Sequence, residues 1–543
     1  MRRGILCVQA LLLLFCCRGQ GFPVAITELM PNPMPSRGLP AEEFVEIWNN
    51  STDTLDLAGW VLTNGRSRAR FPPGSFILPD SLLLLCKAAA VDSFTRYGRV
   101  LGLSRFPALL NDGDTIWLQN AGGEVVHAVG YTARSYGGSP PGGRSLELAD
   151  TERPCRLLGS WRASTDSAGG NPGILRKGIV KNKTPVSFYA FSEEAQILLL
   201  QFNERSSHLP LLTMEPATTI DSVVPAGIMG NRWRVYLREA LLSGTPYTIH
   251  IDSYLTCDTV LTGLQARCMA PDSSYTGLVL NEILFDPPPG GADYVELFNN
   301  GPYAVPLANL RLGNRDRNGA VAALRPLAAD GRCMLPGEWL AFSADTGWIQ
   351  QQFPRAGALA ELASLPSYPN ESGSVVLLHA DGRLIDEVDY NAGWHHPLIR
   401  DPESVALERI DPSATGNDAS NWTSAAIHAR YGTPGLPNTQ QPVQAPALEE
   451  KFFRTEMGLR QVLLRYSFPE RGYVLSVTAY DFSGREIRQL VRNGICGLQG
   501  TLVWDGHGPG GRILPPGAYI LVAEAFNLSG KTLRTRRAVG INW

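Results

Sequence analysis

The sequence predicts an all-β protein made of tandem β-sandwich domains, and three observations support this prediction. Glycine and proline are abundant, with 55 and 40 of 543 residues, and they follow no fibrous period. Short apolar segments such as residues 44–48 alternate between two faces, as a strand requires. Turn residues recur every 8 to 12 positions or so, a spacing typical of sandwiches and barrels.

Part of the chain occurs twice. Residues 26–33 and 43–50 have the sequences Ile-Thr-Glu-Leu-Met-Pro-Asn-Pro and Glu-Phe-Val-Glu-Ile-Trp-Asn-Asn. Residues 280–287 and 293–300 repeat them as Leu-Asn-Glu-Ile-Leu-Phe-Asp-Pro and Asp-Tyr-Val-Glu-Leu-Phe-Asn-Asn. Later landmarks keep the same order while loop lengths differ, which indicates a duplicated domain. We expect the paired asparagines to form tight turns with left-handed backbone.

The shared landmarks are a strand ending in Glu, the Val-Glu-(Ile/Leu)-aromatic-Asn-Asn segment, Leu-x-Gly-Trp, Gly-Asp-Thr, a strand ending in Tyr, and a closing Pro-Gly. This pattern resembles the bacterial lamin-tail domain, an immunoglobulin-like β-sandwich of secreted and surface proteins. The first copy covers residues 22–175 and the second covers 277–438, with Leu310 where the family has tryptophan. The resemblance implies framework roles for these residues: Glu28, Glu46, Trp60, Glu282 and Glu296.

Two further segments also predict β-domains. Residues 178–272 contain alternating strands and a late Leu-x-x-Gly-Thr-x-Tyr pattern that resembles the S-layer-type bacterial immunoglobulin-like domain, although a loose β-linker is the alternative. Residues 439–450 are proline-rich and predict a linker. Residues 451–543 carry Trp504-Asp505-Gly506 and a later Gly-Ala-Tyr, and they resemble the immunoglobulin-like domain of flagellar hook-capping proteins.

Residues 1–19 predict a signal peptide, because two arginines precede an apolar run too short to cross a bilayer. No later segment reaches membrane-spanning length, so we expect a secreted or outer-surface protein, with the periplasm less favoured. The last domain resembles sorting domains of the type IX export machinery. Its basic residues Lys531, Arg534, Arg536 and Arg537 suit such a signal, although a solvated basic edge strand is the alternative explanation for them. A net charge of −3 gives no basic footprint for nucleic acid.

Six cysteines remain after the expected signal peptide. Cys257 and Cys268 are close in sequence and lie in one predicted domain, so they are the candidate disulfide, with two buried thiols as the alternative. Cys86 with Cys155 is a weaker pairing. No cysteine and histidine cluster has the spacing of a zinc site.

The pairs Glu28 with Glu46 and Glu282 with Glu296 are the most enzyme-like residues, since paired carboxylates can divide acid and base roles or bind calcium. Their recurrence favours a structural role in accepting hydrogen bonds from a neighbouring loop. Asn111-Asp112-Gly-Asp114 predicts a turn rather than a calcium loop, and His395-His396 predicts an ordinary loop rather than a metal site. We therefore expect no catalytic residue, metal or cofactor.

These observations predict a non-enzymatic scaffold or adhesion protein that binds an unidentified protein or glycan at the cell surface or in the matrix. Exposed aromatic residues such as Trp348 and Trp394 are candidates for glycan contacts or for ordinary packing. The alternative function is an accessory or targeting arm of a secreted hydrolase or nuclease system, or an enzyme with an unrecognised carboxylate site.

Overall fold

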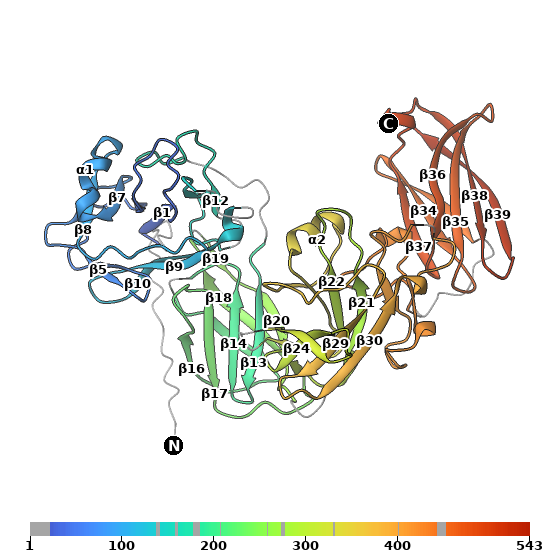
Figure 1. Ribbon diagram of the computed structural model, residues 1–543, viewed down its shortest axis with the longest axis horizontal. Coiled ribbons are helices and arrows are strands. Elements are labelled where there is room, and N and C mark those ends of the chain that lie inside the picture. Colours follow the sequence, from blue (N-terminus) through green and yellow to red (C-terminus); the bar gives the residue numbers. More distant parts are fainter. Residues whose placement is uncertain are drawn as a thin grey trace, which may run out of the picture. The chain divides into compact units, whose positions relative to one another are not determined.

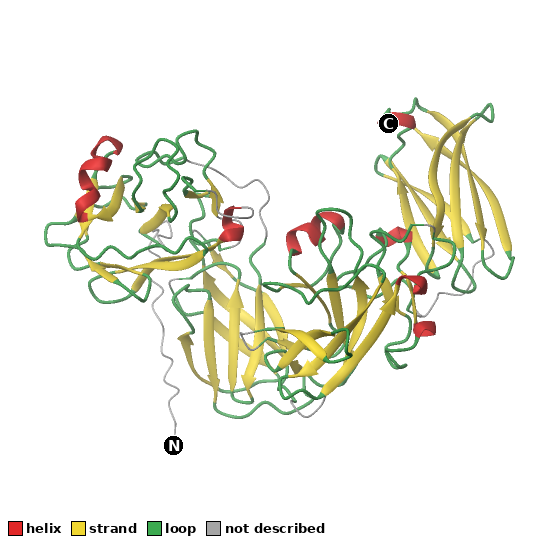
Figure 2. Cartoon of the chain, in the orientation of Figure 1, coloured by secondary structure: helices red, strands yellow, loops and turns green. Residues whose placement is uncertain are grey.

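The computed structural model describes residues 22–136, 142–157, 161–176, 185–206, 208–257, 259–272, 277–328, 332–399, 401–441 and 452–543. The chain divides into two compact units, Met1–Leu241 with Thr245–Cys268, and Leu242–Gly244 with Met269–Trp543. Strands dominate both units and the helices are short (Figures 1 and 2). The predicted all-β fold is confirmed. The expected signal peptide and residues 442–450 of the expected linker lie outside the described residues.

The first module, residues 22–175, contains two main sheets. The larger sheet has the strand order β12-β11-β1-β2-β7-β8 and the smaller one β10-β9-β4-β5. Their strands are β1 (Val24–Met30), β2 (Phe44–Asn49), β4 (Val61–Thr63), β5 (Arg68–Arg70), β7 (Leu82–Lys87), β8 (Val100–Leu103), β9 (Gly113–Gln119), β10 (Val125–Thr132), β11 (Leu146–Leu148) and β12 (Trp161–Ala163). A short pair, β3 (Leu55–Asp56) and β6 (Phe76–Ile77), and η3 (Ala133–Tyr136) complete it.

Both faces of the larger sheet are covered. Val45 and Ile47 point to the core between the sheets, while Phe44 packs on the opposite face with Phe94. Phe94 ends α1 (Val91–Phe94), which lies beside β7 between η1 (Ala88–Ala90) and η2 (Thr95–Tyr97) (Figure 1). Because both faces are covered, all residues of β1 and β2 are buried, including the polar Thr27, Glu28 and Glu46.

The second module, residues 185–268, also has two sheets, with strand orders β13-β14-β17-β16 and β15-β18-β19, and β20 paired to β18. The strands are β13 (Phe188–Glu194), β14 (Ile197–Phe202), β15 (Leu211–Glu215), β16 (Ile220–Pro225), β17 (Arg232–Leu237), β18 (Tyr247–Leu255), β19 (Val260–Leu261) and β20 (Leu264–Cys268). The alternating strands expected from the sequence in this region are present, as β17 and β18 show.

The third module, residues 277–441, repeats the topology of the first. Its sheets have the orders β28-β27-β22-β21-β31-β32, β25-β24-β29-β30 and β23-β26. The strands are β21 (Leu278–Leu284), β22 (Tyr294–Asn299), β23 (Val305–Pro306), β24 (Leu310–Arg315), β25 (Val321–Pro326), β26 (Cys333–Met334), β27 (Trp339–Ser343), β28 (Leu359–Glu361), β29 (Ser372–His379), β30 (Leu384–Asn391), β31 (Leu407–Arg409) and β32 (Trp422–Ser424). The helical segments are α2 (Thr346–Gln352), η4 (Ala392–Trp394), η5 (Ala419–Asn421) and η6 (Ile427–Ala429).

The two copies agree in residue register as well as in topology. Glu28 pairs with Glu46 across β1 and β2, and Glu282 pairs with Glu296 across β21 and β22. The register shifts at the same place in each pair, just before the first glutamate. A β-bulge at the same position in both strand pairs is a specific structural feature, so the two modules share an architecture.

The paired asparagines do not form the expected left-handed turns, because Asn49 and Asn299 do not have positive φ. Their side chains hold the following loop instead. The Asn49 Nδ2 donates to the carbonyls of Asp53 and Leu78 at 2.7 and 3.0 Å. The Asn299 Nδ2 donates to the carbonyls of Tyr303 and Met334 at 2.8 and 2.9 Å.

The fourth module, residues 452–543, has a three-stranded sheet with the order β33-β34-β37 and a four-stranded sheet with the order β36-β35-β38-β39. The elements are β33 (Phe453–Gly458), β34 (Gln461–Ser467), β35 (Val474–Asp481), β36 (Glu486–Ile495), β37 (Gln499–Trp504), η7 (Pro509–Gly511), β38 (Gly517–Phe526) and β39 (Thr532–Ile541). One apolar cluster draws on both sheets, including Leu464, Leu475 and Leu521.

Residues 439–441, which the sequence assigned to the linker, pack in the third module. Gln440 is 1% exposed, and its backbone N–H donates to a Glu408 carboxylate oxygen at 3.1 Å. The Thr439 hydroxyl donates to the same oxygen at 2.7 Å. Residues 439–441 therefore belong to the third module, because polar partners and burial hold them there. In the part of the chain that the structure describes, no helix is long and apolar enough to cross a membrane.

Candidate functional site

The paired glutamates of the first module are buried and accept hydrogen bonds from the loop at its C-terminal end. We call this loop, residues 171–173, and its counterpart at residues 433–435 the closing loops. Glu28 Oε1 accepts from the Ser145 hydroxyl at 2.5 Å and from the Asn171 N–H at 3.0 Å. Glu46 accepts from the Thr27 hydroxyl at 2.8 Å and from the Gly173 N–H at 2.6 Å. We call this set of hydrogen bonds between strand carboxylates and the closing loop the carboxylate latch.

The third module contains the same latch. Glu282 accepts from the Thr433 N–H at 2.9 Å, and Glu296 accepts from the Gly435 N–H at 2.5 Å. Loop residues 433 and 435 occupy the places that 171 and 173 occupy in the first module. Hydrogen bonds to loop backbone are the structural role expected from the sequence.

A third glutamate joins each pair, and the sequence analysis did not give it a role. Glu28 lies opposite Glu147 on β11, and Glu282 lies opposite Glu408 on β31. Glu408 also accepts from the Thr433 hydroxyl at 3.0 Å. The signal was available, because a Leu-Glu dipeptide recurs at the same place in both copies.

Burial makes these carboxyl groups weaker acids than an ordinary glutamate. It raises the pKa of Glu28 to about 8, with the nearby Glu46 charge adding to the effect, and raises the pKa of Glu46 to about 7. Burial also raises the pKa values of Glu282 and Glu296 well above the ordinary range. Such values suit acid and base catalysis. A surface hollow of about 310 Å³ borders Glu46, yet its side chain is engaged with the loop and only 2% of the residue is exposed.

The remaining framework residues lie in the cores of their modules or in turns. Trp60 packs in the core of the first module, and Leu310 takes the equivalent place in the third. Trp504 is 1% exposed, and its indole N–H donates to the His507 carbonyl at 3.1 Å. Asp505 and Gly506 form the turn after it, with Asp505 accepting from the His507 N–H and Gly506 at a φ of 74°.

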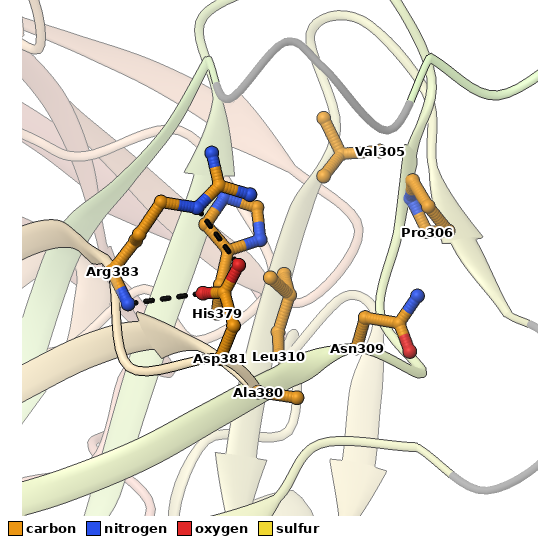
Figure 3. Close-up of a pocket in the computed structure, with 8 residues that line it drawn as sticks. All are labelled: Val305, Pro306, Asn309, Leu310, His379, Ala380, Asp381 and Arg383. Atoms are coloured by element: carbon orange, nitrogen blue, oxygen red, sulfur yellow. Dashed lines mark hydrogen bonds and ion pairs between the residues drawn. The ribbon is translucent and has the colours of Figure 1, made fainter.

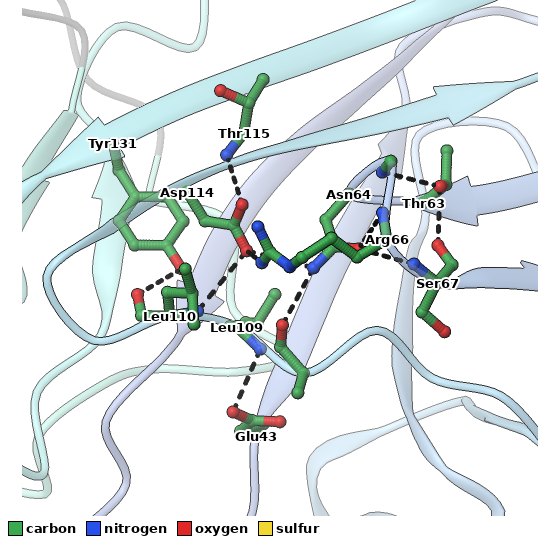
Figure 4. A network of polar contacts seen from close by, with 12 residues as sticks. Glu43, Thr63, Asn64, Arg66, Ser67, Leu109, Leu110, Asp114, Thr115 and Tyr131 are labelled. Carbon is green, nitrogen blue, oxygen red and sulfur yellow. Dashed lines mark hydrogen bonds and ion pairs between the residues drawn. The ribbon is translucent and has the colours of Figure 1, made fainter.

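Asn111 and Asp112 form the turn that the sequence predicted, whereas Asp114 lies in β9. Its carboxylate accepts from the Arg66 guanidinium at 2.6 Å, from the Asn64 amide at 3.2 Å and from the Thr115 N–H at 2.9 Å (Figure 4). Below it in the same network, the Tyr131 hydroxyl donates to the Leu110 carbonyl at 2.8 Å. The Asp114 carboxylate thus serves loop contacts in the first module.

The histidine pair and the candidate glycan-contacting tryptophans pack into the third module. The His395 ring and the His396 N–H both contact the Ser424 hydroxyl at 3.0 Å, and burial lowers the pKa of His395 to about 4. Trp348 and Trp394 are half-buried against apolar clusters. Among the described residues, no group of three or more histidine, cysteine and acidic side chains is placed to hold a metal ion.

The predicted Cys257–Cys268 disulfide is wrong. Cys257 is bonded to Cys155, with 5.6 Å between their Cα atoms. Cys268 is buried and pairs in register with Tyr247 at the start of β18, whereas Cys257 follows the end of that strand. The nine residues from Tyr247 to Leu255 span roughly 26 Å at strand rise, far beyond the ~7 Å limit for a disulfide.

A hollow of about 260 Å³ lies on the third module beside β23 and the turn between β29 and β30 (Figure 3). Val305, Pro306, Leu310 and Ala380 supply its apolar part, and Asn309, His379, Asp381 and Arg383 its polar part. Asp381 accepts from the Arg383 backbone N–H at 3.1 Å and from its guanidinium at 2.9 Å.

The second unit also contains an arginine-lined cleft between the third and fourth modules. Two adjoining hollows of about 540 and 660 Å³ share Arg355, His428 and Thr501. Arg430, Arg454 and Arg465 also line the cleft, and no described acidic residue does. The His428 ring contacts the Tyr466 hydroxyl at 2.8 Å, which joins the two modules at the cleft. No sequence pattern indicates this cleft, because its arginines are far apart in the chain.

Sequence comparison identifies part of the first module. Residues 20–133 match the Lamin Tail Domain family. The match spans β1 to β10, so the lamin-tail region includes Glu28, Glu46 and Trp60 but not β11, β12 or the closing loop. The chain matches none of the curated proteins with which it was compared.

Solved structures give distant similarities. Latent PorU from Porphyromonas gingivalis aligns at 9% identity and a TM-score of 0.15, over 70% of this chain and 35% of its own. A DUF4876 family protein from Bacteroides thetaiotaomicron aligns at 10% and 0.20, over 47% and 92%. A tetra-tandem repeat from the extending region of a large adhesion protein aligns at 11% and 0.12, over 96% and 99%. At these TM-scores the similarities carry no argument about function.

Proposed function

We propose that this chain is a non-catalytic scaffold or adhesion protein that works at the outer cell surface or in the extracellular matrix. The observation that carries the proposal is the carboxylate latch. The most enzyme-like residues of the sequence occur in two modules, and in both they accept hydrogen bonds from the closing loop. A function has to be argued from a site, and this site stabilises a fold.

The proposal includes four β-modules, of which the third is a second lamin-tail domain. Its support is the shared strand order and the shared register of the glutamates. The S-layer-type resemblance of the second module and the hook-capping resemblance of the fourth rest on sequence patterns. Two similar modules in one chain suit a repetitive partner, since linked binding sites gain avidity.

Export is part of the proposal. It rests on the signal-like residues 1–19 and on the sorting-domain resemblance of the fourth module. Truncation after Pro446 followed by cell fractionation tests the sorting role. Loss of surface delivery supports that role, and unchanged delivery contradicts it.

The arginine-lined cleft is the surface that we propose for partner binding, and it favours an acidic glycan. Arg355 and Arg430 are exposed at its edge, and the half-buried Phe452 lies along it. Positive side chains suit carboxylated or sulfated sugars, because charge attracts the anion, and a partly exposed ring offers a stacking surface.

The test is an array of neutral and acidic glycans probed with the mature chain. We expect binding to acidic glycans that falls by about ten-fold in the double variant Arg355→Gln/Arg430→Gln and weakens with added salt. The control Arg162→Gln/Arg238→Gln removes the same charge from the first unit and should bind normally. Equal binding by both double variants would contradict the cleft as the binding surface.

The rival function is enzymatic, through the carboxylates or as an arm of a hydrolase system. Purified mature chain should show no hydrolase activity that depends on Glu46 or Glu296. An activity lost in Glu46→Gln, in protein with a wild-type unfolding temperature, would overturn the scaffold proposal.

A further inference from the structure

The hollow beside Leu310 has a counterpart position in the first module, which strand register identifies. Val305 pairs with Met334 as Leu55 pairs with Ile77. The Leu310 N–H donates to the Leu307 carbonyl at 3.0 Å, as the Trp60 N–H donates to the Leu57 carbonyl at 3.0 Å. Leu310 therefore takes the backbone position of Trp60.

The other side of the hollow can be matched in the same way. Arg311 pairs with Leu378 as Val61 pairs with Gln119, so His379 corresponds to Asn120. The His379 N–H donates to the Arg383 carbonyl at 2.9 Å, and the Asn120 N–H donates to the Glu124 carbonyl at 3.0 Å. Asp381 and Arg383 thus correspond to Gly122 and Glu124.

This correspondence shows two coupled differences between the copies. Where the first module has an indole in its core, 9% exposed, the third has a smaller leucine and a hollow of about 260 Å³. Around that hollow, asparagine, glycine and glutamate are replaced by His379, Asp381 and Arg383. Figure 3 shows Leu310 between the His379 and Arg383 side of the hollow and Asn309.

A small concave site with an apolar base and a few polar groups is the usual form of a ligand site. Its size admits one ring. The fold itself shows which ring fits, because the first module places an indole at the equivalent position. Arg383 and His379 offer a cation and a ring edge for contact with an aromatic face, and Asn309 and Asp381 offer acceptors for an indole N–H.

We propose that the hollow beside Leu310 is a receptor site for a single aromatic side chain, of the tryptophan type, presented by a protein partner. This proposal deepens the proposed scaffold function by naming what one module recognises, and it rests on that function for the partner being a protein. The hollow is separate from the arginine-lined cleft, so a test can contradict the proposal for one site and leave the proposal for the other unaffected.

The experiment uses the mature full chain with indole and N-acetyl-tryptophanamide as probes, followed by ligand-observed saturation-transfer NMR and titration calorimetry. We expect one site for each probe in the wild-type chain. Leu310→Trp fills the hollow from within and should weaken binding by about ten-fold or more. The reciprocal variant Trp60→Leu should add a second indole site in the first module.

A second variant protects the test against misfolding of Leu310→Trp. His379→Ala/Arg383→Ala changes the half-buried last residue of β29 and an exposed residue of the turn that follows it. This variant should keep the wild-type unfolding temperature and should weaken probe binding by about two- to five-fold. Absence of probe binding to the wild type, or equal binding by wild type and Leu310→Trp, would overturn the proposal. Binding of methyl glycosides that Leu310→Trp abolishes, with no binding of indole, would also overturn it in favour of a sugar site.

Discussion

At the scale of single residues, the roles of the glutamates could be predicted and their number could not. Repetition of Glu28 and Glu46 as Glu282 and Glu296 indicated a structural role, because an active site is rarely needed twice. Glu147 and Glu408 were missed, since register across β1 and β11 decides which residues face the pair. Asn49 and Asn299, the last residues of β2 and β22, were misinterpreted. Their side chains hold the following loop by hydrogen bonds to its carbonyls, so the loop does not need a left-handed backbone at these positions.

Buried carboxyl groups make the stability of the first module depend on pH. The folded pKa values of Glu28 and Glu46, about 8 and 7, exceed the unfolded value of about 4.3. The folded state therefore binds more protons, and its stability is fully present below about pH 4 and decreases as pH rises to about 8. Urea unfolding followed by hydrogen exchange in peptides from β1 and β2 measures this slope.

The double variant Glu28→Gln/Glu46→Gln is the control for this pH dependence. Its first module should lose most of the slope between pH 5 and 8, because the titrating groups are gone. An equal slope in the variant, or wild-type stability that increases across this window, would disprove the protonation account.

At the scale of elements, strand existence could be predicted better than strand pairing. The alternating segments 44–48 and 294–298 form strands, and so does the apolar segment 197–202. The disulfide was wrong because proximity in sequence is not proximity in space. The two ends of one strand lie far apart. Cys268, on β20, pairs with the first residue of β18, whereas Cys257 follows the last residue of β18.

The Cys155–Cys257 bond closes a loop with a separation of 102 residues. Cys257→Ser should lower the free energy of unfolding of the first unit by about 2 to 4 kcal/mol, since the unfolded chain gains freedom. A non-reducing proteolytic digest analysed by mass spectrometry should contain a peptide that joins Cys155 to Cys257. The same peptide should persist in the matched variant Cys268→Ser, and a Cys257 to Cys268 crosslink would refute the pairing.

At the scale of the whole molecule, the duplication was readable from the sequence, and its divergence explains what differs between the copies. The latch, the bulge and the tyrosine that donates to a loop carbonyl at 2.8 Å are present in both the first and the third module. The hollow beside Leu310 lies on the third module, where leucine replaces the tryptophan of the first. Its position could be suspected from the missing tryptophan, whereas the arginine-lined cleft could not, because it forms only when two modules pack together.

The central claim is that the paired glutamates latch the closing loops of two related modules. Hydrogen exchange of the mature chain, measured by mass spectrometry in Glu46→Ala and Glu296→Ala, tests it most directly. Glu46→Ala should speed exchange in the peptide around Gly173 and leave the peptide around Gly435 unchanged, because the lost acceptor is local. Glu296→Ala should give the reverse pattern. Unchanged protection of both glycines in both variants would contradict the claim.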